Sequence, residues 1–269
     1  VEGEQRAMGY VFTVSRKLKD SLTIHIGDGL FLDIRKDDSI KVSDYVADFI
    51  AGLGIKHVFS VAGGGSMHLV DSFGKHPEVQ YVACHHEQAA AMAAEAYARV
   101  TGIACCLVTT GPGGTNAITG VACAWIDSIP VVFISGQVTQ DTLLEGTGLR
   151  QFGVQESDIV TLVQPITKYA VTIMDTDEIV NTMQAAMRFA TSGRPGPVWI
   201  DLPLGIQSKR FVPMMQTSWS VEPEGVDVDD IAHCLSLLHK ANRPVLIGGN
   251  GIHLAGAEDA FRELVKALG

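Results

Sequence analysis

The sequence predicts an α/β fold in which a doubly wound, mostly parallel sheet is covered by helices on both faces. Apolar strand segments alternate with helical segments from about residue 43 to residue 201. Strand segments such as IACCLVTT (103–110) and PVVFISG (130–136) are continuous apolar runs. Such runs are typical of parallel strands that are buried on both faces. The regular alternation of the two kinds of segment therefore indicates the α/β class.

The elements follow one another along this segment with few interruptions. Apolar residues from Val46 to Leu53 recur at helical spacing behind Ser43 as a cap, and Gly54 ends this first helix. The elements expected next are a strand at 57–61, a loop at 63–66, a strand near 79–83, a helix at 86–101, a strand at 103–110, a turn at 111–114, a helix near 116–127, a strand at 130–136, a loop at 137–157, a strand near 168–173, a helix near 176–191 and a strand at 197–201.

We divide the chain into four parts, which are an N-terminal extension without an assigned role (1–40), a first domain (41–203), a linker (204–225) and the start of a second, Rossmann-like α/β domain (226–269). In the extension, 23–34 could form two short strands around a Gly-Asp-Gly turn at 27–29. Prolines and weak periodicity mark the linker.

The start of the second domain is expected to hold a helix at about 227–240, a strand at 244–249 and a helix at 256–268. One strand and its helices are too little surface for a sheet with two covered faces. We therefore expect that the chain continues in the intact protein or that a partner completes this unit.

Composition and charge exclude several classes of protein. The net charge of -10 disfavours nucleic acid and anionic membranes as partners, because the overall field repels phosphate. No apolar run is long enough to span a bilayer, and the first residues lack the pattern of a signal peptide, so a cytoplasmic protein is expected. The five cysteines are an odd number without a C-x-x-C pair, which indicates neither a zinc site nor a disulfide framework. We predict no metal site in this chain.

Three polar or glycine-rich segments fall where strands end and helices begin. Glu87 opens the small-residue helix HHEQAAAMAAEAYAR (85–99), and the turns GGGS (63–66) and GPGGTN (111–116) each follow a buried strand. A carboxylate in a first helical turn has an ordinary explanation as a favourable charge near the helix dipole. Open α/β sheets, however, bind ligands at this edge, where glycines allow close approach to the backbone. The convergence of the three segments therefore predicts a ligand site.

Common nucleotide and nucleophile motifs do not account for this edge. Neither glycine turn is followed by Gly-Lys-Ser/Thr, and neither has the G-x-G-x-x-G pattern. No G-x-S-x-G elbow is present for a serine nucleophile. His85 and His86 are adjacent and point to different sides of a helix, so we assign them structural or supporting roles rather than metal binding.

Over about residues 41–269, the order of segments resembles the thiamine-diphosphate-dependent enzyme family, and within it the acetolactate synthase-like branch. The resemblance would make the first domain the pyrimidine-binding domain with the thiamine-diphosphate-binding fold. It is carried by GIKHVFSVAGGGSMHLVDSF (54–73), HHEQAAAMAAEAYARVTG (85–102), LVTTGPGGTNAITGVACAWIDSIPVVFISGQV (107–138), VQESDIV (154–160) and SGRPGPVWIDLP (192–203).

The resemblance implies that Glu87 is the glutamate that activates the cofactor. In the family this carboxyl group bonds a ring nitrogen of the aminopyrimidine and favours the imino tautomer, which takes the proton from the thiazolium carbon. The cofactor performs the carbanion chemistry, while the protein supplies orientation and electrostatics. Such a carboxyl must hold or share a proton near neutral pH, and burial among Ala89, Ala90 and Ala91 would favour this by raising its pKa.

The resemblance also assigns roles to residues around Glu87. Pro112 and Asn116, with Gly63 and Gly64, would line the aminopyrimidine pocket, and Gln155 would lie near the substrate. The chain departs from the branch in three places: Val61-Ala62 replaces a Tyr-Pro, Val154 replaces an aromatic residue against the acceptor keto acid, and Leu204 replaces a lysine. The change at Val154 enlarges the acceptor pocket, so a bulkier acceptor such as a keto sugar is plausible.

From this resemblance we expect a carboligase that decarboxylates a 2-keto acid such as pyruvate and transfers the acyl carbanion to an acceptor carbonyl. Two alternatives stay open, namely a simple 2-keto acid decarboxylase and a non-catalytic pyrimidine-domain subunit. In the family, a later domain binds the diphosphate and Mg²⁺ through a Gly-Asp-Gly motif followed at a set interval by Asn.

The only Gly-Asp-Gly here is at 27–29, and the first Asn of the chain is Asn116, so this copy does not fit and the segment alone should be inactive. The family site forms between subunits, which implies a homodimer or homotetramer. The resemblance leaves FAD open, since acetolactate synthases carry it in the middle domain, which begins here at Arg243.

Overall fold

The computed structural model describes residues 12–16, 21–26, 30–35, 39–144, 146–213, 225 and 227–268. Contacts within the chain divide it into two compact units, one formed by 12–222 and the other by 1–11 with 223–269. Each unit is considered by itself below.

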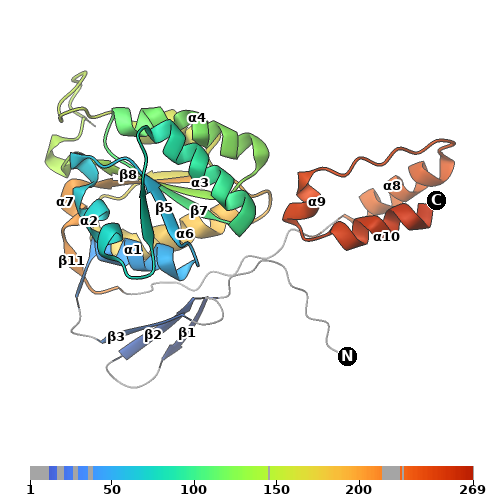
Figure 1. Cartoon of the computed structure of the whole chain (residues 1–269), viewed down its shortest axis with the longest axis horizontal. Coiled ribbons are helices and arrows are strands. Elements are labelled where there is room, and N and C mark those ends of the chain that lie inside the picture. Colours follow the sequence, from blue (N-terminus) through green and yellow to red (C-terminus); the bar gives the residue numbers. More distant parts are fainter. Residues whose placement is uncertain are drawn as a thin grey trace. The chain divides into compact units, whose positions relative to one another are not determined.

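The larger unit is built on a six-stranded sheet in which all neighbouring strands are parallel (Figure 1). The strands lie in the order β6-β5-β7-β8-β10-β9. Their bounds are β5 (His57–Ser60), β6 (Gln80–Ala83), β7 (Ala104–Val108), β8 (Val131–Gln137), β9 (Tyr169–Thr172) and β10 (Val198–Pro203). This confirms the predicted doubly wound α/β class, and all six strands lie within or close to their predicted positions.

Successive residues of the central strands enter two separate hydrophobic clusters, one on each face of the sheet. In β8, Val132 and Ile134 belong to one cluster, and Val131 and Phe133 to the other. Strands β7 and β10 alternate in the same way. Because both faces are buried, every position of these strands is apolar or otherwise compatible with the core, which explains the continuous runs in the sequence.

Helices cover both faces, as a doubly wound sheet requires. The first cluster is closed by α1 (Val42–Gly52), α2 (Met67–Lys75) and α6 (Ile179–Thr191), and the second by α3 (Glu87–Thr101), α4 (Pro112–Asp127) and α5 (Ile159–Val163). Helices α2 and α5 were not predicted, because each is short and lies in a segment that the sequence analysis left without an element. None of the helices in the described part of the chain combines the length and apolar character that a membrane span needs.

The start of α1 differs from the prediction. The N-cap is Lys41, without a side-chain cap, whereas Ser43 lies inside the first turn and is buried. Its hydroxyl accepts a hydrogen bond of 2.9 Å from Ser72 Oγ in α2. The serine therefore joins two helices instead of ending one.

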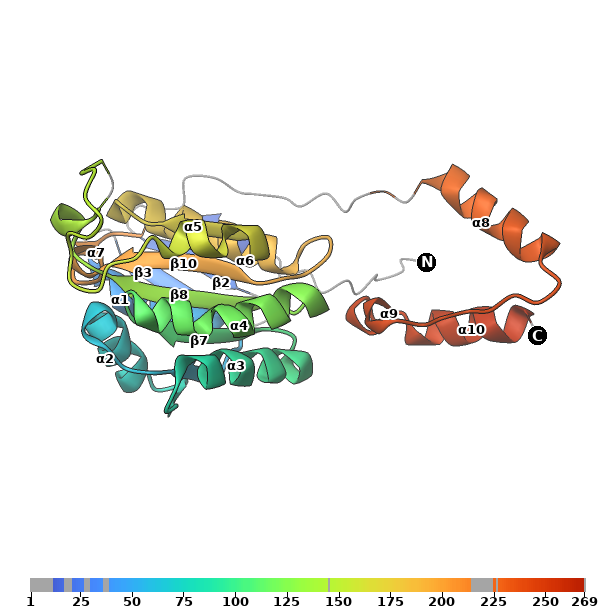
Figure 2. The ribbon, with the colours of Figure 1, turned by 90° about the horizontal axis from the view of Figure 1, so that it is seen from above.

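Helices α3 and α4 run side by side across the sheet (Figures 1 and 2). At their closest point a Cβ atom on Gly120 would lie 2.4 Å from Cβ of Ala91. Ala90, Ala94 and Ala98 are buried in the same cluster. Small residues on both helices allow this approach, and larger ones would separate the helices.

The chain after β10 is more ordered than the predicted linker. Helix α7 (Leu204–Gln207) and strand β11 (Arg210–Phe211) follow directly, and β11 pairs with β4 (Ile40–Lys41) in antiparallel fashion. Ile206 and Gln207 are fully buried. The low periodicity of this segment arises because its elements are too short to show a repeat.

The N-terminal residues form a separate antiparallel sheet of β1 (Phe12–Arg16), β2 (Ser21–Ile26) and β3 (Leu30–Arg35). Ile26 pairs with Leu30, so the two strands predicted within 23–34 are present. The Gly-Asp-Gly turn between them lies outside the described residues.

The second unit contains α8 (Val228–Lys240), α9 (Asn250–Leu254) and α10 (Glu258–Leu268). The predicted helices are present, but the strand predicted at 244–249 is not formed. A strand needs a neighbour for its backbone hydrogen bonds, and the described part of this unit offers none. Val245 and Ile247 are accordingly 80% and 89% exposed.

We expect Gly120→Ala to lower the free energy of unfolding by about 1–3 kcal/mol, because the added methyl group overpacks the contact with Ala91. The matched control is Gly74→Ala in α2, where a Cβ atom meets nothing within 4 Å. This control should be neutral or stabilising, since alanine favours a helix by about 1 kcal/mol. Urea denaturation measures both. Equal stability of the two variants would contradict the close packing of α3 and α4.

Candidate functional site

The candidate site lies at the carboxyl edge of the sheet, where the strand order reverses. From β5 the chain crosses to β6 on one side, whereas β7 lies on the other side of β5. In open α/β sheets the crevice at such a reversal is where ligands bind. The connections after β5 and β7 meet there, and α3, which follows β6, begins with Glu87.

Glu87 contacts α4 through one of its two carboxylate oxygens. Asn116 Nδ2 donates a hydrogen bond of 2.9 Å to Glu87 Oε2. Glu87 Oε1 has no hydrogen bond to any residue that the structure describes. His86 caps the helix, since its Nδ1 accepts from the backbone N–H of Gln88 at 3.1 Å. The carboxylate is thus held on one side and open to a ligand on the other.

The alanines expected around Glu87 only partly enclose it. Ala90 and Ala91 are fully buried, whereas Ala89 is exposed and Glu87 itself is half-buried. The helical turn places successive alanines on different faces, so a run of alanines does not surround its first residue.

Thr109, which follows β7, joins the two glycine turns. Its side chain would lie 2.4 Å from a Cβ atom on Gly63 and 2.7 Å from one on Gly113. Thr109 Oγ1 also accepts from the backbone N–H of Gly65 at 3.1 Å. A Cβ atom on Gly113 would face Glu87 Oε1 at 3.6 Å. Because Gly113 has no side chain, Thr109 packs directly against its backbone, close to the free carboxylate oxygen.

Two residues that the sequence analysis did not single out fix the first glycine turn. Gln207 Nε2 in α7 donates to Gly65 O at 2.7 Å and to Leu202 O at 2.7 Å. A Cβ atom on Gly136 would lie 2.1 Å from Gly65 O. Both contacts come from segments distant in sequence, which local patterns do not reveal.

A second close contact joins the GPGG turn to the loop after β8. Gly111 has φ +58°, and a Cβ atom there would lie 1.7 Å from the backbone oxygen of Gln155. Gln155 has φ +59°, an uncommon backbone conformation for a residue with a side chain. The loop is thus seated directly on the start of α4.

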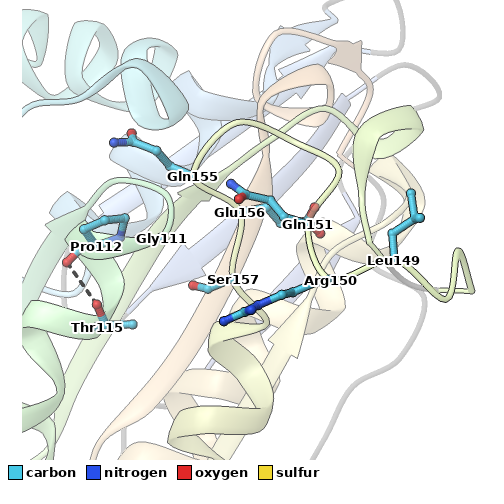
Figure 3. Close-up of a pocket in the computed structure, with 9 residues that line it drawn as sticks. All are labelled: Gly111, Pro112, Thr115, Leu149, Arg150, Gln151, Gln155, Glu156 and Ser157. Carbon is cyan, nitrogen blue, oxygen red and sulfur yellow. Dashed lines mark hydrogen bonds between the residues drawn. The ribbon is translucent and has the colours of Figure 1, made fainter.

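A pocket of about 580 Å³ opens between the start of α4 and this loop (Figure 3). Its lining residues are Gly111, Pro112, Thr115, Leu149, Arg150, Gln151, Gln155, Glu156 and Ser157. Pro112 and Gln155 were predicted from the sequence. Gly111 and Thr115 belong to the GPGGTN turn, and Glu156 and Ser157 to the segment VQESDIV, although none of the four was named as a site residue. Leu149, Arg150 and Gln151 were missed because this part of the loop has no periodicity and belongs to none of the motifs.

Comparison with known proteins relates part of the larger unit to a known family. Residues 40–151 match the thiamine pyrophosphate enzyme family, as its N-terminal TPP binding domain. The match covers β5 to β8 and therefore both glycine turns, Glu87 and Asn116.

The chain is also similar to acetolactate synthases. It is 36% identical over 225 residues to acetolactate synthase 2, chloroplastic, of Zea mays, covering 81% of this chain and 34% of the relative. It is 34% identical over 229 residues to the acetolactate synthase large subunit of Lactococcus lactis, covering 83% and 39%. With the isozyme 3 large subunit of Escherichia coli it shares 37% identity over 227 residues, covering 80% and 38%. The chain thus spans between a third and two fifths of these relatives' length.

The predicted site residues differ in their surroundings. Glu87 and Asn116 are in direct contact, and Gly63 is linked to them through Thr109. A Cβ atom on Gly64 would meet nothing within 4 Å. Val154, predicted to face the acceptor, is 83% exposed and is not among the residues that line the pocket. The roles of all these residues stay predictions.

Glu156 holds together the loop that follows β8. Its Oε1 accepts from the backbone N–H of Leu144 at 2.5 Å, and its Oε2 accepts from that of Gly153 at 3.1 Å. Carboxylate bonds to backbone N–H groups are charge-assisted and therefore stronger than neutral ones. The glutamate thus joins two parts of the loop after β8, at Leu144 and at Gly153.

A buried carboxylate, Asp201, lies at the end of β10. It accepts hydrogen bonds from Ser135 Oγ at 2.5 Å, Gln137 Nε2 at 3.1 Å and Thr172 Oγ1 at 3.2 Å. Gln137 Nε2 also donates to Ser157 O at 3.1 Å, which ties the pocket to the core. Burial raises the pKa of Asp201 from 3.8 to about 6, although its hydrogen bonds oppose this shift.

This pKa predicts a loss of stability as the pH rises. Between about pH 4 and pH 6 folded Asp201 keeps a proton that the unfolded chain releases, so its stabilising contribution is complete below pH 4 and lost through pH 6. The loss is about 3 kcal/mol, at about 1.4 kcal/mol for each pKa unit. Urea denaturation at several pH values should show this fall in the natural sequence and a flatter profile in Asp201→Asn. Parallel profiles would contradict the assignment.

Proposed function

We propose that the protein containing this chain is a thiamine-diphosphate-dependent carboligase of the acetolactate synthase type. It decarboxylates a 2-keto acid such as pyruvate and transfers the acyl carbanion to an acceptor carbonyl. The similarity to acetolactate synthases supports this reaction class, although the chain spans only 34–39% of the compared relatives. Activity, substrates and assembly therefore belong to the proposal.

The observation that carries the proposal is the Glu87–Asn116 pair beside the bare backbone of Gly113. Asn116 occupies one carboxylate oxygen at 2.9 Å and fixes the plane of the group. The other oxygen has no partner among the described residues, and the backbone of Gly113 lies close to it. The described residues thus fit an aminopyrimidine that bonds Glu87 Oε1 and lies against α4.

The protein contributes orientation and one proton site. When bound, thiamine diphosphate supplies the carbanion chemistry. Glu87 holds or shares a proton at Oε1 against the aminopyrimidine, and the rigid contact of α3 with α4 keeps this oxygen in place. Pro112 and Gly63 form the walls beside it, and Gln155 lies on the substrate side. Val154 leaves room for an acceptor bulkier than a small keto acid.

Further parts of the site lie outside this chain in our proposal. Among the described residues, no three His, Cys, Asp or Glu side chains gather to hold a metal ion. Mg²⁺ and the diphosphate would accordingly be bound by a later domain, and a second copy of the protein would complete the site as a homodimer or homotetramer. FAD stays open in this proposal. Absorbance of visible light by the purified full-length protein would show that FAD is bound.

We expect Glu87→Gln in the full-length protein to lower kcat by about 100- to 10,000-fold, the range for loss of a general acid–base group. The amide keeps the shape of the side chain and its contact with Asn116 but cannot exchange the proton. The control is Glu78→Gln, which removes an exposed carboxylate paired with Lys56 and should leave kcat unchanged. Calorimetry with thiamine diphosphate checks that both variants bind the cofactor. Normal activity of Glu87→Gln would end the proposal.

Product analysis separates the carboligase from the two alternatives. With pyruvate, thiamine diphosphate and Mg²⁺, the full-length protein should give a longer hydroxyketone. Acetaldehyde as the only product would favour a simple decarboxylase. Absence of cofactor binding would favour a non-catalytic subunit.

A further inference from the structure

We infer that Arg150 makes the pocket beside Glu87 a binding site for an anionic group of the acceptor, either a carboxylate or a phosphate. This inference rests on the proposed function, because it names the chemical class of the acceptor in that reaction. It adds a residue that determines specificity and that none of the motifs includes.

The charges around the pocket favour an anion. Among the lining residues that the structure describes, Arg150 and Glu156 are charged. The Glu156 carboxylate is occupied on both oxygens by backbone N–H groups of its own loop. Arg150 is exposed and forms no ion pair or hydrogen bond within the described part of the chain. The guanidinium is thus the charge still available to a ligand.

Arg150 is directed into the pocket. Figure 3 shows its side chain extending from the loop towards the side on which Ser157 and Thr115 lie. Arginine presents several N–H donors in a planar fork that matches two oxygens of a carboxylate or phosphate. A lysine would supply the charge without this geometry.

Two further features border the same space. Helix α4, which has 16 residues, has its N-cap Gly111 and its first residue Pro112 in the lining, so the positive end of its dipole favours an anion there. Ser157 also lines the pocket, and its Oγ is shielded and has no hydrogen-bond partner in the described part of the chain. A shielded hydroxyl without a partner is uncommon, and a turn of this side chain towards the cavity would give it a ligand oxygen as partner.

The position of the pocket assigns the anion to the acceptor rather than to the cofactor. Thr115 lines the pocket, and the next residue, Asn116, bonds Glu87. The pocket therefore lies next to the Glu87 site on α4 but does not include Glu87 or Asn116 in its lining. The volume of about 580 Å³ is within the range of small-molecule pockets.

The test uses the full-length protein with thiamine diphosphate and Mg²⁺, pyruvate as donor and three acceptors. These are 2-oxobutanoate, dihydroxyacetone phosphate and neutral dihydroxyacetone. We expect Arg150→Gln to raise KM for an anionic acceptor by about 10- to 100-fold, the range for a hydrogen bond to a charged group, with KM for the neutral one unchanged. The acceptor that responds distinguishes a carboxylate from a phosphate. Arg150→Lys should restore part of the affinity.

The control variant is Lys56→Gln, which removes a positive charge next to the amino end of β5, at the opposite edge of the sheet. It should leave every KM unchanged. Equal effects of Arg150→Gln on charged and neutral acceptors, or none on either, would overturn the inference.

A binding measurement keeps this inference separate from the proposed function. Calorimetry measures the binding of pyruvate and, separately, of inorganic phosphate to the full-length protein without its cofactor. If the natural protein forms no product, the carboligase proposal fails, but loss of anion binding in Arg150→Gln would still support the anion site. Unchanged binding of both anions would overturn it.

Discussion

The close packing of α3 against α4 is the constraint on which the site depends. Gly120 and Ala91 bring the helices together, and this places the first residue of α3 against the first turns of α4. The carboxylate and the amide that meet there come from connections after different strands. Their contact requires the parallel order of β6, β5 and β7, so the sheet topology and the helix contact together create the pair.

The start of α4 borders both the Glu87 carboxylate and the pocket. On one side Asn116 holds Glu87, and on the other Thr115 and Pro112 border the pocket with Arg150. Gln137 donates hydrogen bonds to Asp201 and to the backbone oxygen of Ser157, and these bonds fix the end of the loop.

The sequence was informative where physical constraints are local. Strands β7, β8 and β10 are buried on both faces, so their apolar runs predicted them directly, and the glycine turns and Glu87 lie together at the carboxyl edge as expected. Hydrogen bonds between segments distant in sequence could not be predicted. Examples are the bond from Gln207 to the backbone oxygen of Gly65 and the bond between Ser43 and Ser72. The bonds from backbone N–H groups of the loop to Glu156 were not predicted either. The segment 244–249 has the composition of a strand, but composition does not provide the neighbouring strand that it needs. Arg150 lies in a loop without periodicity, where only the pocket reveals its direction.

The contact of Gly111 with the backbone of Gln155 anchors the loop through main-chain atoms. Exposed side chains of the loop, such as Phe152 and Val154, are no part of this anchor and tolerate exchange. Gly111 itself does not, because a side chain there would displace the loop. A glycine without chemistry of its own therefore controls where the loop sits, whereas the exposed side chains of the loop can differ without moving it.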